Sequence, residues 1–123
     1  MTEERKIKQL FRQLNSSRVY KFPPRGEDLI APIEQGIYVI YDTKGLVVHV
    51  GRTQRGENGL RQRLNNHLRD QSSFAKSFLG KNGNRLRVGY KFRYLIIKDS
   101  RERALVEALA IGKLCPRHLG LGE

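Results

Sequence analysis

The chain has 123 residues and a mass of 14.2 kDa, which is the size of one compact domain. Its 24 Lys and Arg against 12 Asp and Glu give a net charge of +12, so the expected partner is a phosphate polyanion or an anionic membrane surface. No apolar run approaches the roughly 20 residues of a membrane-spanning helix. The first residues also lack the apolar core of a signal peptide, so we expect no membrane insertion.

One cysteine and three histidines limit the redox and metal chemistry of the chain. Cys115 cannot form an internal disulfide, which favours a reducing compartment. A structural zinc site draws several Cys or His ligands together, and so few of them make such a site unexpected. The sequence therefore predicts a cytoplasmic protein without structural zinc that faces nucleic acid.

The excess of positive charge is concentrated in residues 54–91. This segment holds nine Lys or Arg and two Asp or Glu, a net +7 of the +12 for the chain. Five of its arginines are predicted to contact nucleic-acid phosphates: Arg55, Arg61, Arg69, Arg85 and Arg87. An ordinary solvated surface is the alternative, because most charged side chains are simply exposed.

The first half of the chain predicts a helix followed by a hairpin. Apolar residues recur at three- and four-residue spacing in residues 3–15, which indicates an amphipathic helix. The prolines of residues 22–26 interrupt regular structure. Residues 36–42 are β-branched and aromatic and predict a strand, and turn residues follow it. Residues 46–50 predict the returning strand.

The second half predicts two helical segments, a third strand and a last helix. Residues 59–70 place three leucines four apart on a basic helix, and residues 73–79 predict a short helix. The third strand is expected at residues 90–98 and the last helix at residues 104–114. Elements in this order predict an α+β fold, with a small, mainly antiparallel sheet covered by helices.

Four features stand in a recognisable order along these elements. A Gly-Ile-Tyr triplet at residues 36–38 opens the first strand of the hairpin, and a His-Val-Gly triplet at residues 49–51 closes the second. Arg63 follows on the basic helix, and Glu107 lies on the last helix. This order resembles the GIY-YIG nuclease superfamily, although the second triplet has His-Val-Gly in place of Tyr-Ile-Gly.

The resemblance covers about residues 36–119. It implies a three-stranded antiparallel sheet flanked by helices, and hydrolysis of phosphodiester bonds that depends on Mg²⁺ or Mn²⁺. DNA is the expected substrate, while the sequence does not distinguish it from RNA, and strong sequence preference would require a homodimer. The chain then divides into an N-terminal helix with an extended arm at residues 1–35 and a catalytic domain at residues 36–123.

Glu107 is the predicted metal ligand. Its neighbours in residues 104–111 are otherwise apolar, and a carboxylate among them is unfavourable unless it is paired or bound to a cation. Mg²⁺ keeps several waters and needs few protein carboxylates, so a single well-placed Glu is enough. A salt bridge with a neighbouring arginine is the alternative.

The resemblance gives three further residues catalytic roles. Tyr38 matches the tyrosine that contacts the attacking water and is proposed as its general base, which requires a nearby cation because a phenol has a pKa of about 10. Arg63 matches the catalytic arginine, whose fork of donors suits phosphate oxygens. His67 lies four residues further on the same helix face, as a proton donor or phosphate contact. A surface histidine is the alternative for His67.

His49 takes the place of the second family tyrosine and is a candidate to orient or deprotonate water, with an unperturbed pKa of about 6.5. A structural strand histidine is the alternative. His49 can cooperate with Tyr38 only if both project from one sheet face, and the turn between the strands does not fix that register. Gly36 and Gly51 are predicted structural glycines. Gly51 is expected to let substrate approach, with Arg52 contacting a phosphate beside it.

A second departure from the family pattern lies near the C-terminus. Family members commonly place an asparagine that braces the site three residues after the last proline, where this chain has Leu119. His118 is the candidate substitute. The sequence therefore predicts a metal-dependent endonuclease, and the alternatives are a catalytically inactive nucleic-acid-binding module of the same fold or an RNA-directed nuclease.

Overall fold

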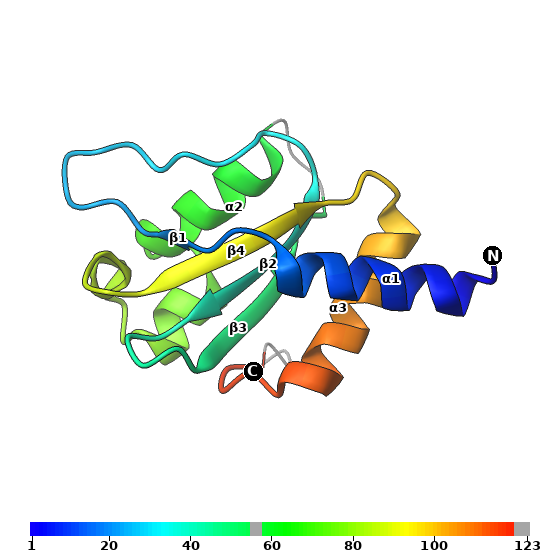
Figure 1. Ribbon diagram of the computed structural model, residues 1–123. Coiled ribbons are helices and arrows are strands. Elements are labelled where there is room, and N and C mark those ends of the chain that lie inside the picture. Colours follow the sequence, from blue (N-terminus) through cyan, green and yellow to red (C-terminus); the bar gives the residue numbers. More distant parts are fainter. Residues whose placement is uncertain (55–57, 120–123) are drawn as a thin grey trace.

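The computed structural model describes residues 1–54 and 58–119 (Figure 1). In chain order its elements are α1 (Glu3–Ser16), β1 (Tyr20–Lys21), β2 (Gly36–Tyr41), β3 (Val47–Arg52), α2 (Gly59–Leu68), the π-type helix η1 (Phe74–Phe78), the 3₁₀ helix η2 (Gly83–Arg87), β4 (Lys91–Ile96) and α3 (Ser100–Leu114). Every predicted helix and strand is present, and β1 and η2 are additional. Among the described residues, no helix is both long enough and apolar enough to span a membrane.

The four strands form one antiparallel sheet in the order β1-β4-β2-β3. The α+β prediction is confirmed, but the sheet has four strands instead of the expected three. The additional strand consists of Tyr20 and Lys21, which pair with Phe92 and Lys91 of β4. Two residues are too few to show the alternating pattern of a strand, so sequence periodicity could not reveal it.

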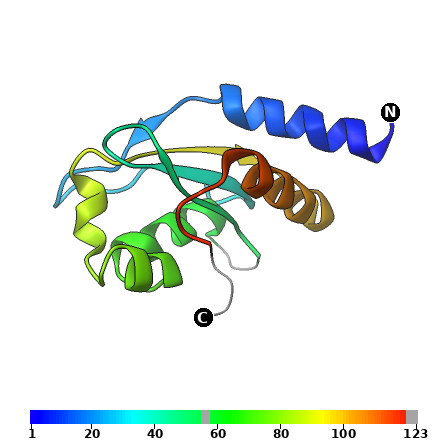
Figure 2. The same ribbon diagram turned by 90° about the horizontal axis from the view of Figure 1, so that it is seen from below.

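The sheet separates two helical layers, each with its own apolar core (Figure 2). α1 and α3 cover one face, where Val39 and Val106 are buried. α2 and η1 cover the other face, where Ile40 and Leu64 are buried. Residues 1–35 take part in this packing, because α1 contacts α3 and β1 extends the sheet. The division of the chain at residue 35 stays a prediction.

A β-bulge decides which side chains of the hairpin share a face. Tyr38 pairs with Gly51, and Ile40 pairs with His49. Beyond this pair the register shifts, and Val48 is the extra residue on β3. Residues paired across an antiparallel ladder project from the same face, so Tyr38 and His49 both face α2. The bulge thus supplies the register that their cooperation requires.

An aspartate determines where α3 begins. The Asp99 carboxylate accepts a hydrogen bond from the backbone N–H of Glu102 at 2.9 Å, which satisfies one of the unpaired donors of the first turn. The helix therefore starts at Ser100, before the apolar pattern that predicted its start at residue 104. The start of the helix at Ser100 also brings Arg103 into α3, where it bonds to the ends of the sheet strands.

Candidate active site

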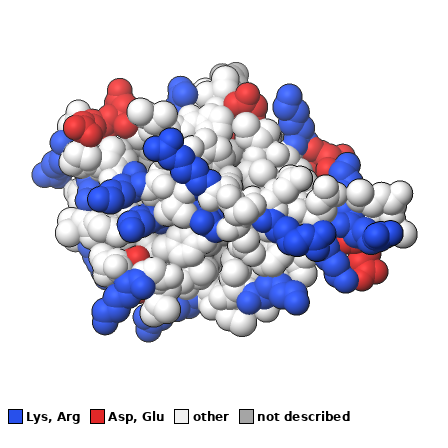
Figure 3. Space-filling view, viewed as in Figure 1, with Lys and Arg blue, Asp and Glu red and all other residues white. Residues whose placement is uncertain are grey.

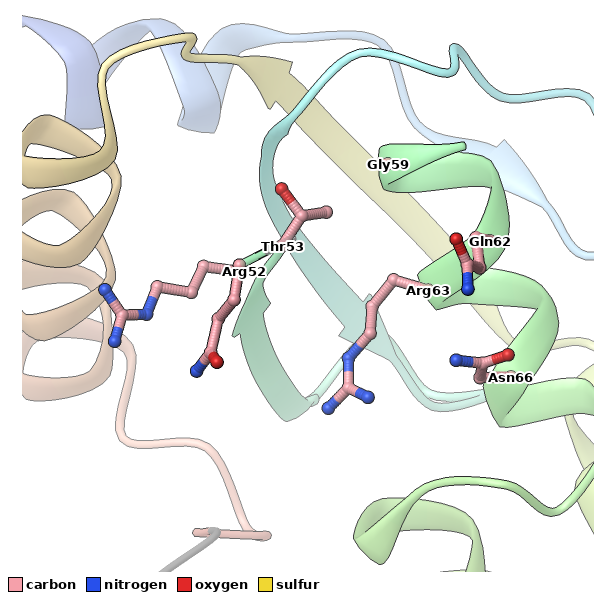
Figure 4. Close-up of a pocket in the computed structure, with 7 residues that line it drawn as sticks. Arg52, Thr53, Gly59, Gln62, Arg63 and Asn66 are labelled. Atoms are coloured by element: carbon pink, nitrogen blue, oxygen red, sulfur yellow. The ribbon is translucent and has the colours of Figure 1, made fainter. Parts of the chain in front are cut away.

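A cavity of about 340 Å³ opens between the end of β3 and α2 (Figure 4). Its lining residues are Arg52, Thr53, Gln54, Gly59, Gln62, Arg63 and Asn66. The described lining has two arginines and no carboxylate, so it suits an anionic group such as phosphate. Arg63 points from α2 into this space, whereas Arg52 points toward α3.

Glu107 lies on α3 next to Arg52. The two side chains form an ion pair, with Arg52 Nε 3.3 Å from Glu107 Oε1. Burial raises the pKa of the Glu107 carboxyl, and the charges of Arg52 and Arg63 partly oppose this shift. The structure therefore contains the salt bridge that the sequence left as the alternative, and it gives Arg52 a carboxylate partner.

A single carboxylate near an open, polar cavity fits a magnesium ion that is ligated mostly by water. Mg²⁺ is usually bound through few protein carboxylates together with waters and substrate phosphates. Within residues 1–54 and 58–119, no group of three or more His, Cys, Asp and Glu side chains could hold a metal ion. Glu107, whose side chain is 24% exposed, is the carboxylate that fits this role.

Arg103 fixes α3 against the ends of β3 and β4. Its buried guanidinium donates hydrogen bonds to the carbonyl oxygens of Thr53, Ile97 and Lys98. Glu107 lies four residues further along α3, on the same helix face, so this clamp also sets the position of Glu107. No sequence motif marks Arg103, because hydrogen bonds to backbone carbonyls require no particular residue type at the partner positions.

Tyr38 is completely buried, on the sheet face that α2 covers. Its hydroxyl oxygen lies 2.7 Å from His67 Nε2 and 3.5 Å from His49 Nε2. Burial raises the pKa of Tyr38 to about 12, although the nearby Arg63 guanidinium opposes the shift. The general-base role predicted for Tyr38 requires a neighbouring cation, and Arg63 is the cationic side chain close to the phenol.

His49 is a buried, neutral imidazole. Its Nδ1 lies 3.2 Å from His118 Nδ1, and its ring stacks on Phe74 with 4.6 Å between the centroids. Burial, with the charges of His118 and Arg63, lowers the pKa of His49 to about 3. The value of about 6.5 for an unperturbed imidazole therefore does not apply. Protonation of His49 is therefore not expected to lower the rate of a reaction at this site as the pH falls just below neutrality.

His67 has no exposed surface. Its Nδ1 lies 2.6 Å from Ser72 Oγ, and its Nε2 faces the Tyr38 hydroxyl. Burial lowers the pKa of His67 well below its usual value, and the Arg63 guanidinium adds to the shift. The surface-histidine alternative is therefore wrong, because His67 lies inside the protein against the Tyr38 hydroxyl. Its role as a proton donor or phosphate contact stays a prediction.

These two histidines should make the fold sensitive to mild acid. His49 and His67 stay neutral in the folded protein, whereas in the unfolded chain their pKa values return to about 6.5. Below that pH the unfolded state binds more protons, so stability is complete above about pH 6.5 and is lost as the pH falls toward the lowered folded-state values. Two such groups give a slope of about 2.7 kcal/mol per pH unit once the unfolded histidines are fully protonated.

Urea unfolding at several values between about pH 7.5 and pH 5 measures this slope above the range in which most carboxylates titrate. The His49→Gln variant removes one of the two groups and should show about half of the wild-type slope. A free energy of unfolding that stays constant over this range would contradict the buried, neutral state of both histidines.

Gly36 and Gly51 both allow close packing. A Cβ atom on Gly51 would lie 2.3 Å from the Tyr38 hydroxyl oxygen, and one on Gly36 would lie 2.3 Å from the Leu95 carbonyl oxygen. The structural role predicted for both glycines thus has a direct steric explanation. The space above Gly51 is filled by Tyr38, however, so the expectation that substrate approaches there is corrected.

Gly51→Ala should destabilise the protein by about 1–3 kcal/mol, because the added methyl overlaps the rigid Tyr38 ring. Thermal unfolding measures the effect. The control is Gly112→Ala on α3, where a Cβ atom meets nothing within 4 Å and the helix should be slightly stabilised. Equal melting temperatures for Gly51→Ala and the wild type would contradict this packing.

Three of the six arginines predicted to contact phosphates lie at a different cavity beside α2. A second cavity of about 450 Å³ is lined by Arg61, Arg69 and Arg87. Glu27 and Asp28 also line it. Arg85 is exposed on η2 outside this lining, and Arg55 falls outside the described residues. Further Lys and Arg side chains are scattered over the face that carries α1, β1 and β4, with a few Asp and Glu among them (Figure 3).

Phe74 of η1 joins the residues of the site and was not found from the sequence. Its fully buried ring lies 4.6 Å from His49, 5.4 Å from His67 and 5.4 Å from His118 between centroids. An aromatic residue in a short helix gives no sequence signal for such a role, because most buried aromatics serve only packing. The structure thus brings all three histidines together around the Phe74 ring, and two of them, His49 and His67, also lie against Tyr38.

No protein-family model and no curated protein sequence matches the chain. Its structure matches the GIY-YIG N-terminal endonuclease domain of UvrC from Thermotoga maritima bound to its catalytic divalent cation, magnesium, with a TM-score of 0.52 and 22% identity over 95% of this chain and 97% of that chain. A variant of that domain with one tyrosine replaced by phenylalanine, also bound to the catalytic cation, matches with a TM-score of 0.52 and 21% identity over 95% of this chain and 96% of that chain. The likeness indicated by the two triplets is thus confirmed at the level of structure: this chain has the fold of the GIY-YIG endonuclease domain.

Proposed function

We propose that the chain is a metal-dependent endonuclease that hydrolyses DNA by attack of water on phosphorus. The observation that carries this proposal is the placement of Arg63. It lines the cavity between the end of β3 and α2, and it also lies close to the buried Tyr38. Arg52 also lines this cavity and forms an ion pair with Glu107. The similar UvrC domain binds magnesium as its catalytic cation, which supports the same requirement here.

Each residue of the site then has a distinct task. Glu107 would hold Mg²⁺, which when bound lowers the pKa of a water ligand and offsets phosphate charge. Arg63 would bind the phosphate oxygens and stabilise the negative charge that develops on them. Tyr38, held by His49 and His67, would accept a proton from the attacking water. The products would carry 5′-phosphate and 3′-hydroxyl ends.

A nucleic-acid-binding module without cleavage is the second candidate. The ion pair between Glu107 and Arg52 and the complete burial of Tyr38 favour it, because both groups would have to become available during the reaction. An RNA-directed nuclease would use the same site, since nothing in the cavity lining distinguishes the sugar.

Incubation of plasmid, single-stranded DNA and RNA with the protein in Mg²⁺, Mn²⁺ or EDTA separates these functions. The proposal predicts cleavage of DNA in either metal and none in EDTA. Tight binding of every substrate without cleavage in any metal would favour the binding module, and cleavage of RNA alone would favour the RNA-directed nuclease.

The exposed arginines at the C-terminal end of α2 and on η2 should contribute affinity without sequence preference. Arg69→Gln and Arg85→Gln should each weaken binding to unrelated duplexes by similar factors, and each lost phosphate contact should reduce the log–log salt slope by about 0.9. Arg5→Gln on α1 is the matched control, because α1 packs on the opposite sheet face and the affinity should change little. Unchanged affinity and slope in the first two variants would identify an ordinary solvated surface.

A further inference from the structure

All three histidines belong to one hydrogen-bonded chain that passes through Tyr38. In order, its members are Ser72, His67, Tyr38, His49, His118 and Ser77. Successive polar atoms are 2.6 to 3.5 Å apart. The inner end is closed, because Ser72 is only 4% exposed, and the outer end reaches the exposed Ser77.

The outer end fixes the direction of these hydrogen bonds. The Ser77 hydroxyl donates to the Ser73 carbonyl oxygen, 2.5 Å away, because a carbonyl can only accept. With its hydrogen used, the Ser77 oxygen accepts from His118 Nε2 at 3.2 Å. When His118 is neutral its imidazole carries a single N–H, and His118 Nδ1 then accepts from His49 Nδ1.

The same rule fixes every bond further inward. His49 Nε2 accepts the hydroxyl hydrogen of Tyr38. The Tyr38 oxygen therefore accepts from His67 Nε2, and His67 Nδ1 accepts from the Ser72 hydroxyl. The Ser72 oxygen in turn accepts the backbone N–H of Ala75 at 3.1 Å, which is consistent with this direction. All the bonds thus point from the buried interior toward the surface.

His118 is well placed as the outer member. Its backbone N–H donates to the Val48 carbonyl at 2.9 Å, which fastens the C-terminal segment along β3 beside the bulge. Its ring is partly exposed, whereas Tyr38 and His67 have no exposed surface. Arg63 is the cation that faces this chain from α2, and its charge disfavours a lasting imidazolium on either buried ring.

We propose that this series of hydrogen bonds conducts a proton from Tyr38 to solvent, and that His118 is the residue that releases the proton. This proposal rests on the proposed role of Tyr38 in hydrolysis. As the water oxygen bonds to phosphorus and the P–O3′ bond breaks, the water proton moves to the Tyr38 oxygen, and the Tyr38 hydroxyl proton moves to His49 Nε2. The leaving 3′ oxygen takes a proton from solvent. His49 Nδ1 passes its proton to His118 Nδ1, and His118 Nε2 releases one to water. Charge balances, because one proton enters and one leaves. After the transfer His49 carries its proton on Nε2 and His118 on Nδ1, so both rings must return to their starting tautomers before the next turnover.

Nitrogen-15 NMR of histidine-labelled protein near neutral pH tests the donor-to-acceptor direction of these hydrogen bonds independently of catalysis. The expected pattern is His49 protonated on Nδ1, and His67 and His118 protonated on Nε2. The Nδ1–H form is the less common one for an imidazole in water, so it is diagnostic for His49. Protonation of His49 on Nε2 would overturn the proposal whether or not the protein cleaves nucleic acid.

Single-turnover cleavage tests the transfer itself. His118→Ala should lose about 10²-fold in rate at unchanged affinity, and added imidazole should restore part of the loss. His118→Gln keeps hydrogen-bonding capacity but cannot pass a proton, so it should lose a similar factor and show no rescue. The neighbouring exposed residue gives the control, Arg117→Lys, which should keep the wild-type rate.

The outcomes separate this proposal from the one on which it rests. Full activity of His118→Ala, or a loss that imidazole does not restore, would overturn the proton exit in a protein that is still a nuclease. The expected tautomers in a wild-type protein that never cleaves would overturn the proposed function and the transfer step, while the direction of the hydrogen bonds would stand. Melting temperatures of the variants identify any loss that comes from unfolding.

Discussion

Glu107→Gln should abolish cleavage while leaving the fold and nucleic-acid binding intact. A metal ion contributes several kcal/mol of transition-state stabilisation, which corresponds to a loss of at least about 10³-fold in single-turnover rate. Glutamine has nearly the same shape, and burial, which raises the pKa of this carboxyl, opposes the charge that the substitution removes. Binding in EDTA should be equal or slightly tighter, because one negative charge leaves the neighbourhood of Arg52.

The same helix provides a control for this substitution. Glu102→Gln removes a carboxylate that pairs with Lys6 on the surface, and it should cleave at nearly the wild-type rate. Rates from single turnovers and affinities from fluorescence anisotropy separate the two effects. Wild-type cleavage by a folded Glu107→Gln protein would remove the metal assignment and the hydrolytic mechanism with it.

Arg63→Ala should reduce the chemical rate far more than the affinity. The guanidinium lies in the cavity and close to Tyr38, where negative charge develops in the transition state. Removal of such a donor typically lowers the rate by about 10²–10³-fold. Arg63→Lys should recover little, because a single ammonium does not reproduce the planar fork of donors.

Arg61 provides the comparison, because it lies on the same helix but on its other side. Its Nε donates to the Ala31 carbonyl at 2.9 Å, and its side chain lines the second cavity. Arg61→Ala should therefore weaken binding with a small effect on the rate of bound substrate. Equal effects of the two substitutions on affinity, with no difference in rate, would leave Arg63 without a special role.

The fold could be predicted from the sequence wherever a pattern repeats over several residues. The helix at residues 3–15 and the strands of the hairpin follow from such periodicity. The bulge at Val48 could not be predicted, because it is a single inserted residue set by the pairing of β2 with β3. The two residues of β1 pair with a strand about 70 positions later, and no local signal marks them.

The candidate site could be predicted only where the family pattern or an unusual residue marked it. Glu107 stood out as a carboxylate in an apolar helix segment, and Tyr38 by its triplet. The environment of His49 could not be predicted, because its main partner His118 is 69 residues away in the sequence. For the same reason, its neutral state emerges only from burial and neighbouring charges in the fold.

The most direct test of hydrolysis by water is the origin of the oxygen in the cleaved phosphate. DNA would be cleaved by the wild-type protein with Mg²⁺ in ¹⁸O-enriched water, and the ends analysed by mass spectrometry. We expect a single ¹⁸O atom in the 5′-phosphate, an unlabelled 3′-hydroxyl, and no cleavage in EDTA or by Glu107→Gln. Label in a 3′-phosphate, or unchanged cleavage in EDTA, would contradict this mechanism.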